Sequence, residues 1–335
     1  MPEVLEASRK RRVFVTFCFN SQTMAAELGG CSLVSCQEAY AKSLNSFIAS
    51  LDSKKGNLTL KCLEGHVVPL LSDLFKVHTA EKLPFCVLSV GSGEGSNDLS
   101  FIEMLIKSLQ GAGIRPWIFQ HAIEPDEAKL WSFRAKAEDL RVRLKNRVLG
   151  NVDFEWFPMT YDEYIEQTKS KVVKFNVVHF LHSIYYIGPD LETALKHCYE
   201  KELGPKGVIF SITPDFNSPY ARYGKAFSSE GLILSPGSYY SNKEVIDIAK
   251  RNGWKYKECS GESVSCNIAG IFDRSSVEGN LLLDFLTQWK NISQTAGEEN
   301  LKKILSFGEN ECTASSHGQK LVTFENRTVM IFKES

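Results

Sequence analysis

The sequence predicts an α/β protein in which a mostly parallel sheet is covered by helices on both faces. Two observations predict this class. Short, nearly continuous apolar runs, typical of strands buried on both faces, alternate with longer segments whose apolar residues recur at helical spacing. Such alternation makes consecutive strands parallel, because each helix returns the chain to the same edge of the sheet. The 335 residues, 43% of them hydrophobic, are enough for a sizeable core.

The alternation begins after an N-terminal helical region. Apolar spacing predicts two helices between residues 36 and 75, and the run from Pro84 to Val90 is the first buried strand. Further strands are expected at 117–123, 152–157, 175–181 and 207–212. The helices that connect them are expected at 96–110, 126–149, 160–170 and 191–202.

The pattern changes after the strand at 207–212. Residues 213–240 are rich in aromatic residues, proline and serine, and we expect them to form an insertion over the sheet edge. Ser241 to Glu244 has the spacing of a capping box and predicts a helix to about Asn252. The remaining expectations are a strand at 254–259, helices at 281–289 and 298–307, and a terminal hairpin of 320–323 with 329–333. Residues 1–35 are interpreted as a flexible extension of the chain.

Charge and cysteine usage restrict the partners and the compartment. A formal net charge of −1 gives no overall attraction to nucleic acid or to an anionic membrane, so a small molecule is the expected partner. No apolar run approaches the roughly 20 residues that span a bilayer. Nine cysteines without a Cys-x-x-Cys pair indicate reduced thiols rather than disulfides or zinc ligands. The expected location is therefore cytoplasmic.

Three alternating glycines follow the strand that ends at Val90. They occupy Gly91-Ser92-Gly93-Glu94-Gly95, immediately before the expected helix at 96–110. Glycine adopts a positive φ cheaply and lets the backbone approach a ligand, so a nucleotide-like cofactor is expected here. A dinucleotide fingerprint requires glycine where the chain has Ser96, and no G-x-x-x-x-G-K-[ST] motif is present. Both observations disfavour a bound phosphate.

Glu124 favours S-adenosylmethionine as the cofactor. It follows the expected strand at 117–123 and therefore lies at the same edge of the sheet as the glycines. S-adenosylmethionine has no phosphate, and an acidic side chain at this point can accept the hydrogens of both ribose hydroxyls. The alternative is that the glycines form only a tight turn and that Glu124 caps the next helix.

A second group of polar residues surrounds the end of the strand at 175–181. His182, Tyr185 and Tyr186 follow this strand and are expected to face the reacting group. His179 lies inside the strand and is interpreted as a core residue. No Cys, Asp or Glu accompanies the two histidines at ligand spacing, so no metal site is predicted.

At these residues the chain resembles the histamine N-methyltransferase family, which includes a carnosine N-methyltransferase. The similarity covers about Tyr40 to Phe332. Its most specific pieces are Leu88–Gly95, Ile123–Pro125, Tyr185–Tyr186, Asp284–Thr287 and Phe324–Asn326. The resemblance implies a cytosolic monomer with a Rossmann-like class I methyltransferase fold, which has a seven-stranded, mostly parallel sheet. Residues 36–335 would form this S-adenosylmethionine-dependent domain, whose N-terminal helices, insertion at 213–240 and C-terminal hairpin complete the substrate pocket.

Position by position, the resemblance assigns cofactor contacts to one set of residues and substrate contacts to another. The cofactor set is Gly91, Gly93, Glu124, Lys129, Tyr161 and Leu181, and Lys129 stands where the family has a glutamine. The substrate set is Tyr40, Tyr185, Tyr186, Tyr220, Phe227, Phe285 and Asn326. His182 and Asn326 are the predicted catalytic residues, expected to orient an imidazole ring. Uptake of a proton by His182 is the alternative role.

Departures from the histamine enzymes favour a different substrate. Those enzymes carry a glutamine where this chain has His182, a glutamate where it has Ser53, and a cysteine where it has Gly237. A site that loses hydrogen-bond partners rejects its ligand strongly, so carnosine is the expected substrate and histamine the alternative. The candidate cations for the carboxylate of carnosine are Lys54, Lys55, Arg222 and Arg327.

Two functions of other classes also stay open. A catalytically inactive, methyltransferase-like binding protein is equally compatible with the altered polar residues. An NAD-linked oxidoreductase would instead bind NADH and ignore S-adenosylmethionine.

Overall fold

The computed structural model describes residues 31–52, 57–78, 84–147, 150–169, 173–187, 190–228, 240–314 and 319–334. The chain divides into two compact units, each assembled from separate stretches of sequence. The first unit takes in Met1–Gly56, Asn217–Tyr239 and Val264–Phe324. The second takes in Asn57–Phe216, Tyr240–Ser263 and Glu325–Ser335. Strands β7 (Lys255–Asn267) and β10 (Lys320–Phe332) each run from one unit into the other.

A twisted, mostly parallel sheet organises the second unit. Its strands lie in the order β4-β3-β2-β5-β6-β10-β7, and the short strand β9 (Thr313–Ala314) also pairs with β10. The pairs that join β4, β3, β2, β5 and β6 are parallel, whereas β10 is antiparallel to β6. The strand order reverses direction between β2 and β5, where open sheets of this kind bind ligands. The predicted Rossmann-like class is confirmed. The parallel strands are β2 (Phe85–Val90), β3 (Trp117–Ile123), β4 (Asn151–Phe157), β5 (Phe175–Leu181) and β6 (Leu203–Pro214).

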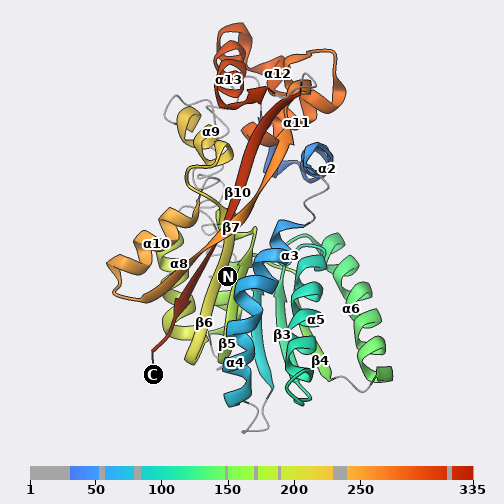
Figure 1. The fold of residues 1–335 in the computed structure, drawn as a ribbon, viewed down its shortest axis with the longest axis vertical. Helices are drawn as coiled ribbons and strands as arrows, with labels where there is room; N and C mark the ends of the chain where they lie inside the picture. The colour runs from blue at the N-terminus through green and yellow to red at the C-terminus, as the bar shows by residue number, and fades with distance from the viewer. Residues whose placement is uncertain are drawn as a thin grey trace, which may run out of the picture. The chain divides into compact units, whose positions relative to one another are not determined.

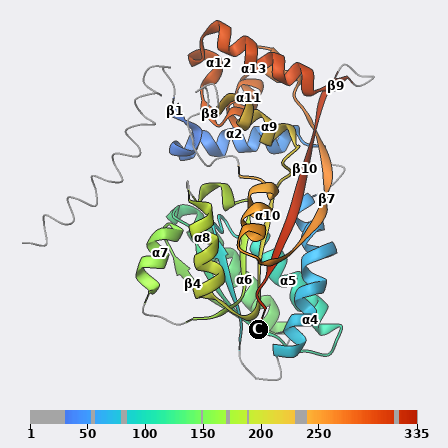
Figure 2. The ribbon, with the colours of Figure 1, turned by 90° about the vertical axis from the view of Figure 1, so that its left-hand side faces the viewer.

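Helices cover both faces of this sheet, as Figures 1 and 2 show. Alternate strand residues point to opposite faces, so that Val87 joins one hydrophobic cluster and Leu88 the other. The first cluster is completed by α3 (Leu58–Cys62), η3 (Leu63–Val67), α4 (Val68–His78), α5 (Ser96–Gln110) and α6 (Glu127–Arg147). The second is completed by α7 (Tyr161–Thr168), η5 (Ile184–Tyr186), α8 (Leu191–His197), η6 (Cys198–Glu202) and α10 (Asn242–Arg251).

The first unit is mainly helical. Phe47 of α2 stacks on Phe285 of α11 with ring centroids 4.5 Å apart, and Phe324 of β10 meets Phe47 edge-on at 5.3 Å. Buried Asp284 accepts the backbone N–H of Asn291 at 2.8 Å and thereby holds the turn after α11. The unit contains β1 (Cys31–Ser32), η1 (Leu33–Ser35), α2 (Gln37–Ser50), α9 (Pro219–Ser228), η7 (Ala269–Phe272), α11 (Val277–Thr287), β8 (Trp289–Lys290), α12 (Ile292–Thr295) and α13 (Gly297–Glu311).

The predicted terminal hairpin is wrong, because Lys320–Phe332 is one continuous strand. Asn326 and Arg327 lie between the two strands of the predicted hairpin, but in the structure they pair with Pro214 and Thr213 of β6. Asn-Arg lacks the glycine that tight two-residue hairpin turns favour. The charge of Arg327 is also matched within the unit, because its Nε donates to Asp215 at 2.5 Å. The sheet ladder therefore continues through these residues.

The N-terminal extension and the insertion lie only partly within the described residues. Residues 1–30 are outside them, whereas Cys31 and Ser32 pair with β8. Within the insertion expected at 213–240, helix α9 is described and residues 229–239 are not. None of the helices that the structure describes is long and apolar enough to cross a bilayer.

Candidate active site

The glycine loop after β2 has the backbone that its sequence predicts. Gly91 and Gly93 have φ angles of +71° and +56°, which side-chain-bearing residues rarely adopt. A Cβ at Gly91 would lie 2.5 Å from the Cβ of Ser183, so this glycine permits a close approach between the loop and the chain after β5. A Cβ at Gly93 would meet no atom within 4 Å among the described residues. The loop is thus closed at Gly91 and open to a ligand at Gly93.

Glu124 is buried and bonded to the same loop. Its Oε2 accepts the N–H of Gly93 at 2.9 Å, and its Oε1 accepts the N–H of Asp126 at 3.0 Å. Each carboxylate oxygen has a second lone pair, so the side chain retains acceptor capacity for a ligand. The two backbone bonds fix the carboxylate at the end of β3, beside the loop.

The other predicted cofactor residues lie on two helices and one strand around this edge. Lys129 is in the first turn of α6, with its Nζ 3.6 Å from Asp126. Leu181 is the last residue of β5 and is buried. Tyr161 begins α7, and its hydroxyl donates to Glu202 at 2.7 Å and contacts the Sγ of Cys198 at 2.8 Å. The Tyr161 hydroxyl is therefore engaged inside the unit.

His182 lies directly after β5 in a left-handed backbone conformation, with φ of +56°. Its Nε2 is 2.8 Å from the hydroxyl oxygen of Thr59, a residue of α3. Burial lowers the pKa of His182 to about 4. Its ring is therefore neutral at physiological pH and is a hydrogen-bonding group rather than a strong base.

Asn326 lies two strands away from His182 at the same edge of the sheet. In the parallel β5–β6 ladder Leu181 pairs with Ile212, and across β6 Asn326 pairs with Pro214. Strand spacing places the two backbones about 10 Å apart. A Cβ at Gly261 of β7 would lie 1.7 Å from the carbonyl oxygen of Asn326, so only glycine lets β7 pack against it here. The side-chain amide of Asn326 has no hydrogen-bond partner within the described part of the chain.

Tyr185 and Tyr186 form the short helix η5 after His182. Their rings meet edge-to-face with centroids 4.6 Å apart. Tyr185 packs against the second hydrophobic cluster, whereas Tyr186 is 48% exposed. An aromatic pair thus extends from the core of the unit to its surface beside His182.

The remaining predicted substrate residues belong to the first unit. Tyr40 of α2 and Phe285 of α11 have ring centroids 6.1 Å apart, so they share one hydrophobic contact. Tyr220 and Phe227 are residues of α9, but their side chains lie outside the described set. Ser53 and Gly237 are also outside the described residues.

Two of the four candidate side chains for the carboxylate of carnosine lie within the described residues, and both already have acidic partners. Arg327 pairs with Asp215 at 2.5 Å and with Glu325 at 3.0 Å. Arg222, in the first unit, pairs with Glu311. Lys54 and Lys55 lie outside the described residues. Neither arginine therefore presents an unopposed charge.

Three contributors to this edge were missed by the sequence-based prediction. Thr59 supports His182, and the Ser183 hydroxyl donates to the Val90 carbonyl oxygen beneath the glycine loop. Asp98, buried in the first turn of α5, accepts a hydrogen bond from Gln120 at 2.6 Å, and burial raises its pKa to about 6. The sequence could have indicated Asp98, because it is an acidic residue only three positions after the last glycine of the loop. His179, 3.6 Å from Asp98, is fully buried, as expected of a core residue.

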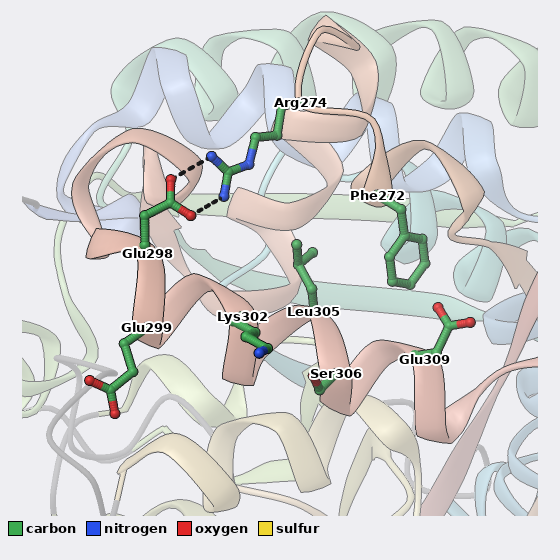
Figure 3. A pocket seen from close by; sticks show the side chains of 8 residues that line it. All are labelled: Phe272, Arg274, Glu298, Glu299, Lys302, Leu305, Ser306 and Glu309. Carbon is green, nitrogen blue, oxygen red and sulfur yellow. Dashed lines mark hydrogen bonds and ion pairs between the residues drawn. The ribbon is translucent and has the colours of Figure 1, made fainter.

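A separate pocket lies on the first unit and contains none of the predicted site residues (Figure 3). Arg274 and Glu298 form a two-pronged ion pair across it, with N–O distances of 2.7 and 2.6 Å. Its remaining lining residues are Phe272, Glu299, Lys302, Leu305, Ser306 and Glu309. No cluster of three or more His, Cys, Asp or Glu side chains is placed to hold a metal ion in the portion that the structure describes.

Curated relatives cover most of the chain. Histamine N-methyltransferase B of Xenopus laevis is 24% identical over 311 residues, which cover 91% of this chain and 98% of the relative. Carnosine N-methyltransferase 2 of Gallus gallus is 27% identical over 254 residues, which cover 74% of each chain. No family model matches the chain.

Solved structures resemble the chain more distantly. A SAM-dependent methyltransferase from Geobacter sulfurreducens, in complex with S-adenosyl-L-homocysteine, is 16% identical with a TM-score of 0.37. The similarity covers 78% of this chain and 90% of that chain. The order of the strands, rather than this likeness, carries the assignment of the fold.

Proposed function

We propose that this chain, which is similar to histamine and carnosine N-methyltransferases over most of its length, transfers the methyl group of S-adenosylmethionine to a ring nitrogen of a small imidazole compound. The similarity to these relatives supports N-methyl transfer as the reaction, with S-adenosylmethionine as the methyl donor. The proposal concerns the acceptor and the residues that bind it. It rests on two polar groups at the carboxyl edge of the sheet, His182 Nδ1 and the amide of Asn326, which lack partners among the described residues.

The cofactor would lie against the loop of Gly91 and Gly93. The open space at Gly93 and the carboxylate of Glu124, held beside it at 2.9 Å, support this position. We propose that Glu124 binds the ribose hydroxyls, and that Lys129, Tyr161 and Leu181 surround the rest of the cofactor. The engaged hydroxyl of Tyr161 leaves only its ring for such a contact.

The acceptor chemistry requires positioning more than a base. A free imidazole has a pKa near 6.5, so at neutral pH much of it is uncharged and has a lone pair on one nitrogen. The methyl group of a sulfonium can then be taken up by that lone pair without prior removal of a proton. Holding the nitrogen in line with the methyl group can contribute about 7–11 kcal/mol at best. His182 and Asn326 would supply this orientation through hydrogen bonds.

Aromatic residues would exclude water from the reacting nitrogen. Tyr185 and Tyr186 lie three and four residues after His182, and their edge-to-face rings support a role beside the acceptor. The methylated imidazole is cationic at first, and aromatic faces attract such a cation. The substrate roles of Tyr40, Tyr220, Phe227 and Phe285, which belong to the first unit, stay predictions of the resemblance.

Carnosine is the first acceptor to test and histamine the second. The replacement of a glutamine by His182 argues against an unchanged histamine site. The acidic partners of Arg222 and Arg327 argue against these two residues as carboxylate ligands. The deciding experiment incubates the protein with radiolabelled S-adenosylmethionine and carnosine, histamine or histidine in parallel. Cofactor binding without transfer to any of the three would identify a catalytically inactive binding protein instead, and binding of NADH alone would favour an oxidoreductase.

His182→Ala and Asn326→Ala are expected to lower kcat at least tenfold, because each removes one hydrogen bond that orients the acceptor. The dissociation constant of S-adenosylmethionine should change little, since neither side chain belongs to the glycine loop. His66→Ala is a matched control, because His66 also makes one hydrogen bond in the second unit, to the Ser260 carbonyl at 3.0 Å. Single-turnover kinetics and equilibrium dialysis measure the two quantities. Loss of cofactor binding in either site variant would contradict the assignment.

A further inference from the structure

The backbone of His182 is held in an uncommon conformation that aims its side chain. A φ of +56° is strained for a non-glycine residue, and such residues cluster at functional sites. The surrounding structure maintains it from both sides. The N–H of His182 donates to the Ile212 carbonyl at 3.1 Å, and the next residue, Ser183, is bonded to the Val90 carbonyl. The direction of the imidazole is therefore set by the fold.

Thr59 meets this imidazole from a fixed position. It is buried in the first turn of α3, 123 residues before His182, with its hydroxyl oxygen 2.8 Å from Nε2. Asn57 caps the helix by accepting the N–H of Thr59 at 3.0 Å and that of Leu60 at 3.3 Å. The hydroxyl thus belongs to a well-anchored helix end rather than to a loose side chain.

The two ring nitrogens of His182 have different surroundings. Nε2 has Thr59 as its partner, whereas Nδ1 has no hydrogen-bond partner anywhere in the described portions of the chain. Because burial lowers the pKa of His182 to about 4, the ring carries one proton at neutral pH. One nitrogen is therefore a donor and the other an acceptor, and the partner of Nε2 influences which is which.

The chemistry of the acceptor decides which tautomer is useful. A neutral imidazole has one N–H and one nitrogen lone pair, and only the lone pair can take the methyl group. A group that binds the ring without blocking that lone pair must bind the N–H, and so must itself accept a hydrogen bond. Nδ1 of His182 is an acceptor only when the proton is on Nε2, where the oxygen of Thr59 can receive it.

We infer that Thr59 is a positioning residue that keeps His182 in its Nε2–H tautomer, so that Nδ1 accepts the N–H of the substrate imidazole. This inference rests on the proposed imidazole acceptor. It names Thr59 as a residue on which the reaction depends without touching either substrate. The inference also means that His182 only accepts a hydrogen bond, both before and after methyl transfer. Its ring is too weakly basic to keep the proton that the methylated product releases.

The test compares Thr59→Val, which keeps the shape and removes the hydroxyl, with Thr59→Ser, which keeps the hydroxyl. Thr59→Val should lower kcat/KM for the imidazole acceptor about tenfold, the effect of one lost hydrogen bond, and leave the dissociation constant of S-adenosylmethionine unchanged. Thr59→Ser should restore activity to near that of the wild type. Long-range ¹H–¹⁵N correlation spectra, with the signal of His182 assigned by its loss in His182→Gln, should show Nε2–H in the wild type and mixed tautomers in Thr59→Val.

The spectrum separates this inference from the proposed function. A wild-type Nδ1–H tautomer, or a Thr59→Val protein with unchanged spectrum and unchanged kcat/KM, overturns the role of Thr59. A wild-type protein that methylates no imidazole overturns the proposed acceptor instead. In that event, the wild type could still show the Nε2–H tautomer and Thr59→Val could still lose it. That result would support the role of Thr59 in setting the tautomer of His182.

Discussion

Gly93→Ala is expected to weaken the binding of S-adenosylmethionine about 100-fold, or about 2.7 kcal/mol, while the protein stays folded. The added methyl group would meet no described atom within 4 Å, so the fold has room for it. The same space is where the cofactor would approach the loop, and a methyl group there would displace it. The N–H of Gly93 also orients Glu124, so a shift of the loop would disturb the proposed ribose ligand. Both effects act on the cofactor more than on the fold.

Gly113→Ala provides the matched control for this variant. Gly113 has a φ of +74°, and a Cβ there would also meet no described atom within 4 Å. It lies in the turn between α5 and β3, at the opposite edge of the sheet from the loop. Both variants should therefore lose about 1–2 kcal/mol in the free energy of unfolding, the cost of a left-handed alanine. Only Gly93→Ala should lose cofactor affinity.

Calorimetric titration with S-adenosylmethionine and urea unfolding measure the two quantities in each protein. Wild-type affinity in Gly93→Ala would exclude the loop as the cofactor site. An equal loss of affinity in Gly113→Ala would indicate instead that loosening of the whole unit lowers the affinity.

The parallel strands were predictable because their burial leaves a local signal. A strand covered on both faces consists almost entirely of apolar residues, so its limits coincide with the limits of an apolar run. The predicted strands 117–123 and 175–181 agree residue for residue with β3 and β5. The glycine loop and Glu124 were found for the same reason, since each directly follows such a run.

Features that depend on distant parts of the chain were not predictable in this way. The apolar spacing in α2 does not reveal that Phe47 stacks on Phe285, more than 200 residues later. The sequence therefore did not predict which separate stretches of the chain form the first unit. The continuous strand β10 depends on pairing with β6, whereas the local sequence at Asn326 and Arg327 resembles a polar turn. Thr59 was missed because nothing near it in the sequence indicates its contact with His182.

Glu202 is expected to make the second unit less stable as the pH rises. It is buried in η6, where Tyr161 donates to it at 2.7 Å and the Nε2 of His197 lies 3.7 Å away. Burial raises its pKa from 4.5 to about 7, although the hydrogen bonds from Tyr161 and Cys198 and the charge of Lys174 oppose this rise. The folded protein therefore keeps a proton on Glu202 between about pH 4.5 and 7, where the unfolded chain has lost it. Stability from this group is fully present below about pH 4.5 and is lost as the pH rises through 7, by up to about 3 kcal/mol.

Other buried groups also titrate, so the wild-type profile alone does not isolate Glu202. Asp98, whose pKa is raised to about 6, acts in the same direction. His179 and His182, whose pKa values are lowered to about 3 and about 4, act in the opposite direction below pH 6.5, because the unfolded chain protonates them first. A difference between two proteins that share these groups removes their contributions.

Glu202→Gln is the variant that isolates the effect, because its amide oxygen still accepts from Tyr161 but carries no titrating proton. The difference in the free energy of unfolding, variant minus wild type, should rise by about 3 kcal/mol between pH 5 and pH 8. It rises because ionisation of the buried carboxyl destabilises only the wild type. Urea unfolding at several pH values measures this difference. A difference that does not change with pH would mean that Glu202 ionises as easily in the folded protein as in the unfolded chain. The charge of Lys174 and the Nε2 of His197, 3.7 Å from Glu202, would then have to stabilise the ionised carboxylate more strongly than burial destabilises it.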